Sequence, residues 1–205
     1  METPLDLPPP APAEREHSAA LEAVIRAEME AAGGALPFQR FMELALYAPG
    51  LGYYAAGAPK LGPGGDFVTA PEMSDLFGAC IARLCAPVLE ALGDDAQVLE
   101  LGPGSGALAA TLLEALEGLG RAPVRYRLLE TSPDLRQRQE QRLAGLDPGL
   151  AGRLSWEERL PEPGFRGVVI ANEVADAIPC RRVRLGPGAP GEWWVAPGEG
   201  GFRWT

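Results

Sequence analysis

Helical periodicity dominates the first half of the chain. Apolar residues recur every three or four positions over residues 21–29, 38–46 and 76–88. Ser18 is the expected N-cap of the first of these helices, Pro37 opens the second and Ser74 precedes the third. Gly33-Gly34 and Pro49-Gly50 are expected to end the first two. The N-terminal region is therefore predicted to be helical.

The second half of the chain alternates short apolar runs with helical repeats. Strands are predicted over residues 98–101, 124–129, 154–156 and 168–171. Helices are predicted over residues 107–119 and after Ser132, with Pro133 at the first helical position. Strands that alternate with helices indicate a parallel sheet with helical cover, so the predicted fold class is α/β. Residues 187–205 predict a hairpin with arms at 193–195 and 202–204.

These patterns divide the chain into four regions. We expect a disordered tip at residues 1–17 and a helical region with a cofactor-proximal loop at 18–93. An α/β core follows at 94–180, and residues 181–205 form the start of a β insertion. Doubly wound cofactor folds usually have about six strands, and the pattern supplies fewer. The sequence is therefore expected to be the N-terminal part of a longer protein.

Composition narrows the possible functions. The 205 residues carry a net charge of -10, which argues against non-specific nucleic-acid binding. His17 is the single histidine, which argues against a histidine triad or a histidine metal cluster, and no metal site is predicted. The sequence start lacks the features of a signal or transit peptide, and no apolar run is long enough to span a membrane. A cytoplasmic location without membrane insertion is the resulting expectation.

The most informative motif is a glycine-rich loop between a predicted strand and a predicted helix. Gly102, Gly104 and Gly106 fall at alternate positions directly after the apolar strand. Glycines allow a tight turn and a close approach of the backbone to a ligand. The helix that follows offers N–H groups without intrahelical acceptors. This arrangement predicts a site for a nucleotide-like cofactor.

Two carboxylates help to distinguish between possible cofactors. Gly102, Gly104 and Ala107 match the dinucleotide fingerprint, but that match alone is weakly specific. Glu100 at the end of the strand would repel a pyrophosphate and would suit a cofactor that carries a sulfonium and an ammonium group. Glu130, at the end of the next strand, can accept hydrogen bonds from ribose hydroxyls in either cofactor class. The pair favours S-adenosyl-L-methionine (SAM) over NAD.

A second polar cluster follows the strand at residues 168–171. Asn172 and Glu173 come directly after it, and Asp176 follows three residues later. If a helical turn forms there, Glu173 and Asp176 share a face and could accept the donors of a guanidinium group. We predict Asn172, Glu173 and Asp176 as catalytic residues, with an N-cap and a solvated acid as the alternative. The loop before Ser74 is either a capped surface loop or a lid over the cofactor.

Taken in order, the motifs resemble one family, the SAM-dependent methyltransferases of the MidA family. These proteins are relatives of the mitochondrial complex I assembly factor that methylates an arginine. The resemblance extends from about Pro37 to the end of the chain. It rests on Phe38, Phe41-Met42, Ala45-Leu46-Tyr47, Pro49-Gly50, Gly52-Tyr53-Tyr54, the run from Gly65-Asp66 to Pro71-Glu72, the Glu100–Gly106 loop, and Asn172-Glu173 with Asp176-Ala177 and Pro179.

The resemblance implies a class I methyltransferase (Rossmann-like) fold and N-methylation of a protein arginine, with a respiratory-chain subunit as the candidate substrate. It implies that the three loop glycines and Glu130 bind SAM. Asp66 and Thr69 are then expected at the cofactor site, and Glu72 and Tyr53 at the substrate site. Two other functions stay open, namely a non-catalytic SAM-binding assembly module and an NAD-dependent oxidoreductase.

Overall fold

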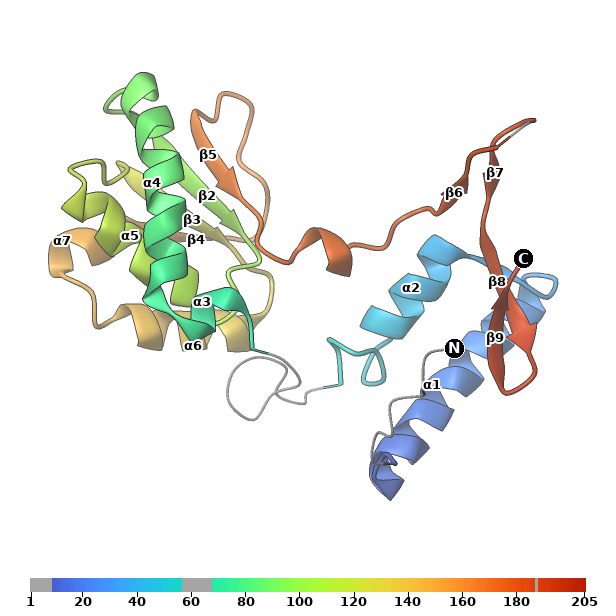
Figure 1. Ribbon diagram of the computed structural model, residues 1–205. Coiled ribbons are helices and arrows are strands. Elements are labelled where there is room, and N and C mark those ends of the chain that lie inside the picture. Colours follow the sequence, from blue (N-terminus) through green and yellow to red (C-terminus); the bar gives the residue numbers. More distant parts are fainter. Residues whose placement is uncertain (1–8, 57–67, 187) are drawn as a thin grey trace, which may run out of the picture. The chain divides into compact units, whose positions relative to one another are not determined.

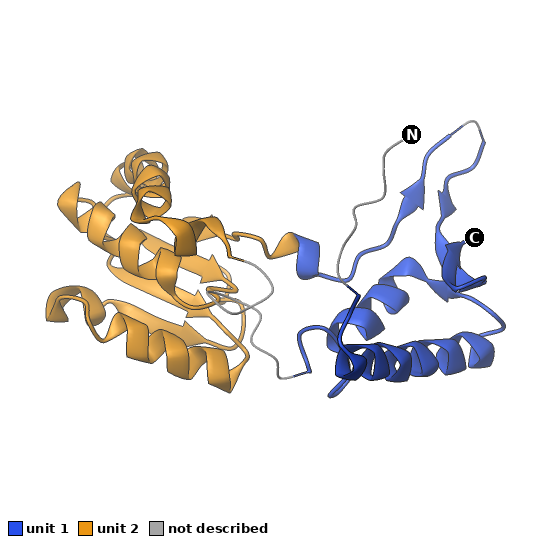
Figure 2. Cartoon of the chain, turned by 60° about the horizontal axis from the view of Figure 1, so that its bottom comes forward, with its two compact units in different colours: residues 1–58, 176–205 blue, residues 59–175 orange. Residues whose placement is uncertain are grey.

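The computed structural model describes residues 9–56, 68–186 and 188–205. The chain divides into two compact units (Figures 1 and 2). Unit 1 comprises residues 1–58 and 176–205, and unit 2 comprises residues 59–175. This division differs from the ranges expected from the sequence, because the segment at the C-terminal end joins the N-terminal helices in unit 1.

Unit 2 contains a four-stranded parallel sheet. Its strands are β2 (Gln97–Leu101), β3 (Arg125–Leu129), β4 (Leu154–Glu157) and β5 (Gly167–Ile170), in the spatial order β4-β3-β2-β5. The chain runs outward from β2 through β3 to β4 and then returns to the other side of β2 as β5. The strand order therefore reverses between β2 and β5, which is the place where open α/β sheets bind their ligands.

The helices of unit 2 are α3 (Ala70–Met73), α4 (Asp75–Leu92), α5 (Ala107–Gly118), α6 (Pro133–Leu143) and α7 (Pro148–Ala151). The predicted Ser132 cap of α6 is confirmed, and Ser74, which was expected only to precede α4, caps that helix as well. Ser74 Oγ accepts a hydrogen bond from Leu76 N at 3.1 Å, and Ser132 Oγ accepts one from Leu135 N at 3.4 Å. Each cap satisfies an N–H group that the first helical turn leaves without a partner. Figure 1 shows these helices beside the sheet.

One hydrophobic core joins α4, α5 and α6 to the sheet. Its largest fully buried side chains are those of Val98, Leu112, Leu113, Leu116, Tyr126, Leu128 and Leu143. A fully buried leucine contributes about 2 kcal/mol by leaving water. Successive side chains of a strand point to opposite faces, so Glu100 lies on the same face of β2 as Val98. The strand thus carries one carboxyl group into an apolar interior.

Unit 1 combines the two ends of the described chain. Its helices are α1 (Pro12–Ala31) and α2 (Phe38–Tyr47). Its strands are β1 (Leu36–Pro37), β6 (Val183–Arg184), β7 (Gly191–Glu192), β8 (Trp194–Gly198) and β9 (Gly201–Trp204). The short 3-10 turn Ala175–Ala177 lies where the chain passes from unit 2 into unit 1. Strands β8 and β9 form the predicted hairpin, and β1 pairs antiparallel with β8. The buried core side chains are Ile25, Met29, Leu36, Leu44 and Val195.

The start of the first helix differs from the prediction. Helix α1 begins at Pro12, so Ser18 lies inside it and is not its N-cap, and residues 12–17 of the expected disordered tip are helical. Ala11 N donates to the Glu14 side chain at 2.6 Å. Proline at the first position needs no hydrogen-bond acceptor, and Glu14 satisfies a group at the helix start. None of the helices in the described ranges is long and apolar enough to cross a membrane.

Candidate functional site

The glycine loop connects β2 to α5 at the carboxyl edge of the sheet. Gly102, Gly104 and Gly106 have φ angles of +56°, +57° and +82°, a backbone region that side-chain-bearing residues rarely adopt. Gly102 N donates to Leu129 O at 3.1 Å, which fixes the start of the loop against β3. Gly106 is the N-cap of α5 and supplies no side-chain cap. Ala107 N donates to Ser105 Oγ at 3.3 Å, so Ser105 satisfies one N–H group at the start of α5. The loop lies at the N-terminus of this helix, which is where a cofactor cradle is expected.

Glu130 lies at the same edge of the sheet, directly after β3. One of its carboxylate oxygens accepts from Ser132 N at 2.8 Å, and the other accepts from Gln139 Nε2 at 3.1 Å. A carboxylate has about four acceptor positions, so two remain for further donors. This acceptor capacity would suit the two hydroxyls of a ribose, and the predicted ribose contact of Glu130 stays a prediction.

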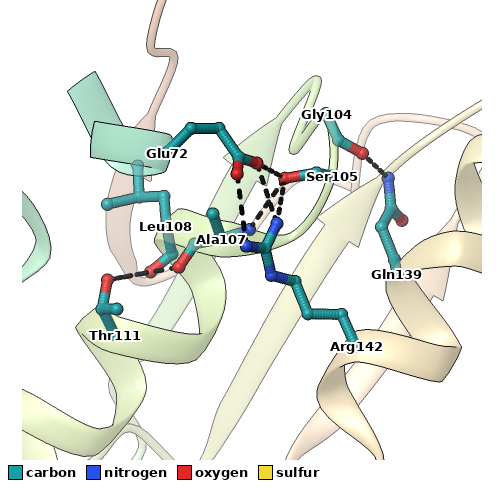
Figure 3. Close-up of polar contacts among 8 residues, drawn as sticks. All are labelled: Glu72, Gly104, Ser105, Ala107, Leu108, Thr111, Gln139 and Arg142. Carbon is teal, nitrogen blue, oxygen red and sulfur yellow. Dashed lines mark hydrogen bonds and ion pairs between the residues drawn. The ribbon is translucent and has the colours of Figure 1, made fainter. Parts of the chain in front are cut away.

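A second set of contacts fastens the segment before α4 to the glycine loop (Figure 3). The Ser105 hydroxyl donates to the Glu72 carboxylate, and Arg142 Nη1 donates to Ser105 Oγ at 2.6 Å. Arg142 also contacts both Glu72 oxygens, at 2.8 and 3.2 Å. The guanidinium of Arg142 holds the pKa of Glu72 below its usual value. Helices α3 and α6 are therefore tied to one residue of the loop.

The loop residues before α4 are only partly described. Thr69 is the N-cap of α3, but its side chain makes no cap hydrogen bond. Asp66 lies outside the described residues. The expected cofactor contacts of Asp66 and Thr69 stay predictions, as does the expected substrate contact of Glu72. Tyr53 lies in unit 1, where its ring packs edge-on against Tyr54 with the ring centroids 5.0 Å apart, and its substrate role also stays a prediction.

Glu100 is more enclosed than its position at the end of a strand suggested. Its side chain is 2% exposed, and Tyr126 Oη donates to Glu100 Oε2 at 2.7 Å. Burial raises the pKa of Glu100 to about 7, and the hydrogen bond from Tyr126 offsets part of this effect. The predicted contact of Glu100 with a cationic cofactor stays a prediction, while its packing in the core is a structural observation.

Burial of Glu100 predicts that stability falls as the pH rises. Between the ordinary carboxyl pKa of 4.5 and about 7, the native state holds a proton that the unfolded state has lost. The free energy of unfolding should therefore decrease across this window, by about 3 kcal/mol at most. Glu100→Gln should remove most of the decrease, which urea unfolding at pH 5 and pH 8 would measure. Glu117→Gln, at an exposed site on α5, is the matched control.

If Glu100→Gln lost as much stability between these pH values as the unaltered chain, another group would be responsible for the decrease. If the control also removed the decrease, the effect would reflect net charge rather than burial.

The predicted catalytic cluster begins where β5 ends. Asn172 is half-buried, and Glu173 is exposed with a φ of +52°, the single positive φ among the non-glycine residues described. Such backbone strain is concentrated at functional sites. The expected helical turn is a short 3-10 turn at Ala175–Ala177 that contains Asp176 but not Glu173. The two carboxylates are therefore not on successive turns of one helix, and the catalytic assignments stay predictions.

Two polar residues of α6 were not singled out from the sequence, namely Gln139 and Arg142. Gln139 is completely buried and lies between Leu135 and Leu143 at spacings of four residues. An amide in the middle of an otherwise apolar helical stripe is a signal of a buried polar contact. Arg142 offered no comparable signal, because arginine is common in the last turn of a helix.

The parallel sheet and the glycine loop at its switch point define a Rossmann-like, cofactor-binding α/β protein. The chain belongs to the family of S-adenosyl-L-methionine-dependent methyltransferases, whose family model matches residues 80–205. This agrees with the resemblance inferred from the motifs and identifies SAM as the cofactor of the family. The NAD-dependent alternative finds no support in these comparisons.

Individual relatives support the same assignment. The chain is 39% identical over 120 residues to protein arginine methyltransferase NDUFAF7 of Danio rerio, covering 56% of this chain and 28% of the relative. It is 32% identical over 174 residues to the Xenopus laevis protein of that name, covering 74% of this chain and 40% of the relative. The chain therefore spans less than half the length of these two relatives.

A solved structure provides the comparison of folds. A crystal structure of a protein from Burkholderia thailandensis bound to S-adenosyl-homocysteine has 46% sequence identity and a TM-score of 0.81. The match covers 98% of this chain and 52% of that one. The predicted fold class is confirmed over the described part of the chain.

The expected cytoplasmic location is wrong. The relatives from Danio rerio, Xenopus laevis and Drosophila melanogaster are all named as mitochondrial proteins. The expectation rested only on composition and on the sequence pattern of the first residues.

Proposed function

We propose that this chain is part of an enzyme that transfers a methyl group from SAM to an arginine side chain of a protein. The observation that carries the proposal is the position of two motifs on the sheet. The glycine loop follows β2 and Asn172-Glu173 follows β5, and these strands are hydrogen-bonded neighbours on either side of the switch point. A cofactor cradle and an acidic substrate pocket are thus expected at one edge.

The residues of this chain fit the cofactor by two tests. A Cβ on Gly102 would lie 3.1 Å from Val174 Cγ2, and a Cβ on Gly106 would lie 3.4 Å from Gln139 Cγ, so the loop has little room for side chains. Glu130 retains free acceptor positions for ribose hydroxyls. Gly102, Gly104, Gly106 and Glu130 would hold the cofactor, which supplies a methyl group already activated on a sulfonium.

The acidic cluster has a different task. The guanidinium nitrogen forms a bond to the methyl carbon as the carbon–sulfur bond breaks, and the nitrogen loses one proton. Glu173 would stabilise the cationic guanidinium, orient the nitrogen and take up that proton, and Asn172 would help to orient it. Asp176 is the second proposed carboxylate. The relatives named protein arginine methyltransferases support arginine as the acceptor, and the family resemblance supports a complex I subunit as the substrate.

The test uses the 205-residue chain with SAM labelled in its methyl group. Recombinant complex I subunits, expressed without methylation, serve as acceptors, and amino-acid analysis after acid hydrolysis identifies the labelled residue. We expect label in methylarginine and none after the accepting arginine is replaced by lysine. Label in another residue would contradict the arginine assignment. Binding of S-adenosyl-homocysteine without transfer to any subunit would favour the non-catalytic assembly module instead.

A further inference from the structure

We propose that Gln139 is a positioning residue of the cofactor site, which fixes the Glu130 carboxylate for ribose binding and holds the glycine loop against it. This inference rests on the proposed SAM site and extends it to a residue that does not itself touch the cofactor. Gln139 lies on α6, and its side chain reaches the loop carbonyl of Gly104 (Figure 3).

Every polar position of the Gln139 amide that the structure assigns has a partner of the opposite kind. Nε2 donates to Gly104 O at 2.8 Å and to Glu130 Oε2 at 3.1 Å, while Oε1 accepts from Trp156 Nε1 at 2.9 Å. The indole N–H is only a donor, and the carbonyl and carboxylate are only acceptors. A flipped amide would face three mismatched partners, so its orientation is fixed by the network.

The same side chain also supports the loop by packing. Gln139 is completely buried, and its Cα, Cβ and Cγ lie 3.4–3.6 Å from the position that a Cβ on Gly106 would occupy. Gln139 therefore hydrogen-bonds two parts of the predicted cradle, Gly104 and Glu130, and fills the space beside a third, Gly106. Movement of α6 would disturb all three together.

A neutral amide suits this position better than a charged donor. An arginine or lysine would pair with Glu130 as an ion and compete with ribose hydroxyls for its lone pairs. The amide of Gln139 takes one position on one oxygen, and Ser132 N takes one on the other. The carboxylate is thus held at both oxygens and keeps an acceptor position on each.

The experiment compares two ligands on variants of the 205-residue chain by isothermal titration calorimetry. The ligands are S-adenosyl-homocysteine and its 2′,3′-dideoxy analogue, which lacks the ribose hydroxyls. Gln139→Met keeps the length of the side chain and removes its hydrogen bonds. We expect the affinity for S-adenosyl-homocysteine to fall about tenfold. The affinity for the analogue should fall by a smaller factor, because the analogue loses only the support of the loop. Gln137→Met, at an exposed site on α6, is the matched control and should change neither.

A role in stability alone would lower both affinities by the same factor, and that result would overturn the proposal, as would unchanged binding of both ligands. If circular dichroism shows that Gln139→Met does not fold, Gln139→Asn replaces it. The shorter side chain keeps a buried amide but withdraws it from Glu130. The affinity for S-adenosyl-homocysteine should again fall more than that for the dideoxy analogue. If the unaltered chain did not bind S-adenosyl-homocysteine, the cofactor site itself would be contradicted. Failure of the proposed function would thereby be distinguished from failure of the Gln139 assignment.

Discussion

Replacing Glu173 by glutamine is expected to lower the rate of methyl transfer by about 1000-fold and to leave the affinity for S-adenosyl-homocysteine within about twofold. Glutamine has nearly the same shape but no charge, so it cannot stabilise the guanidinium cation or accept its proton. The cofactor contacts assigned to the loop and to Glu130 do not involve this side chain. Single-turnover transfer of labelled methyl, together with calorimetric binding, would measure both quantities.

The backbone conformation of Glu173 indicates that the glutamine variant should fold normally. A glutamate held at a φ of +52° costs about 1–2 kcal/mol relative to ordinary backbone. Glutamine should bear a similar cost, so the variant should fold as well as the unaltered chain. Glu162→Gln, an exposed carboxylate after β4, is the control and should transfer methyl at the normal rate. Equal rates for Glu173→Gln and the control would remove Glu173 from the proposed chemistry.

The second large effect is expected from Gly102→Ala. The new Cβ would lie 3.1 Å from Val174 Cγ2, and the backbone at φ +56° disfavours any side chain. We expect a loss of stability of about 2 kcal/mol and a roughly 100-fold weaker affinity for S-adenosyl-homocysteine. The affinity falls because the loop must shift away from its cradle geometry, and 100-fold corresponds to about 2.7 kcal/mol. Urea unfolding and calorimetry would measure the two losses separately.

Gly120 is a matched control for backbone strain. Its φ is +66°, and a Cβ added there would meet nothing within 4 Å. Gly120→Ala should therefore lose about 1 kcal/mol of stability through its backbone alone and bind the ligand normally. If both alanine variants bound S-adenosyl-homocysteine normally, the glycine loop would not be the cofactor cradle.

The sequence was sufficient to predict the sheet and the loop because both depend on local patterns. Apolar runs, capping serines and alternate glycines each act within a few residues, and β2, α5, β3 and α6 lie close to their predicted positions. The start of α1 was missed because Pro12 and Glu14 provide a stronger start signal than Ser18. Capping rules do predict a helix start at Pro12 and Glu14, but these two residues lie in the segment that was expected to be disordered.

The contacts within the site were less predictable because they join residues that are distant in the sequence. Glu72 meets Arg142 through the fold of α3 against α6, and the amide of Gln139 meets Gly104 and Trp156. The burial of Glu100 depends on the helices that cover its face of the sheet. Residue types and strand ends predicted where the site lies, whereas its internal hydrogen bonds required the structure.

The pairing of β1 with β8 affects the order in which the two units fold during synthesis. Leu36 cannot pair with Val195 until the whole of unit 2 has been synthesised, so the core of unit 1 is completed after unit 2 has emerged from the ribosome. Unit 2 is continuous in sequence, and its sheet is fully synthesised once β5 has emerged. Long-range pairings form late and slowly. The nascent chain should therefore form its glycine loop first. Helices α1 and α2 can complete their core only after β8 has been synthesised.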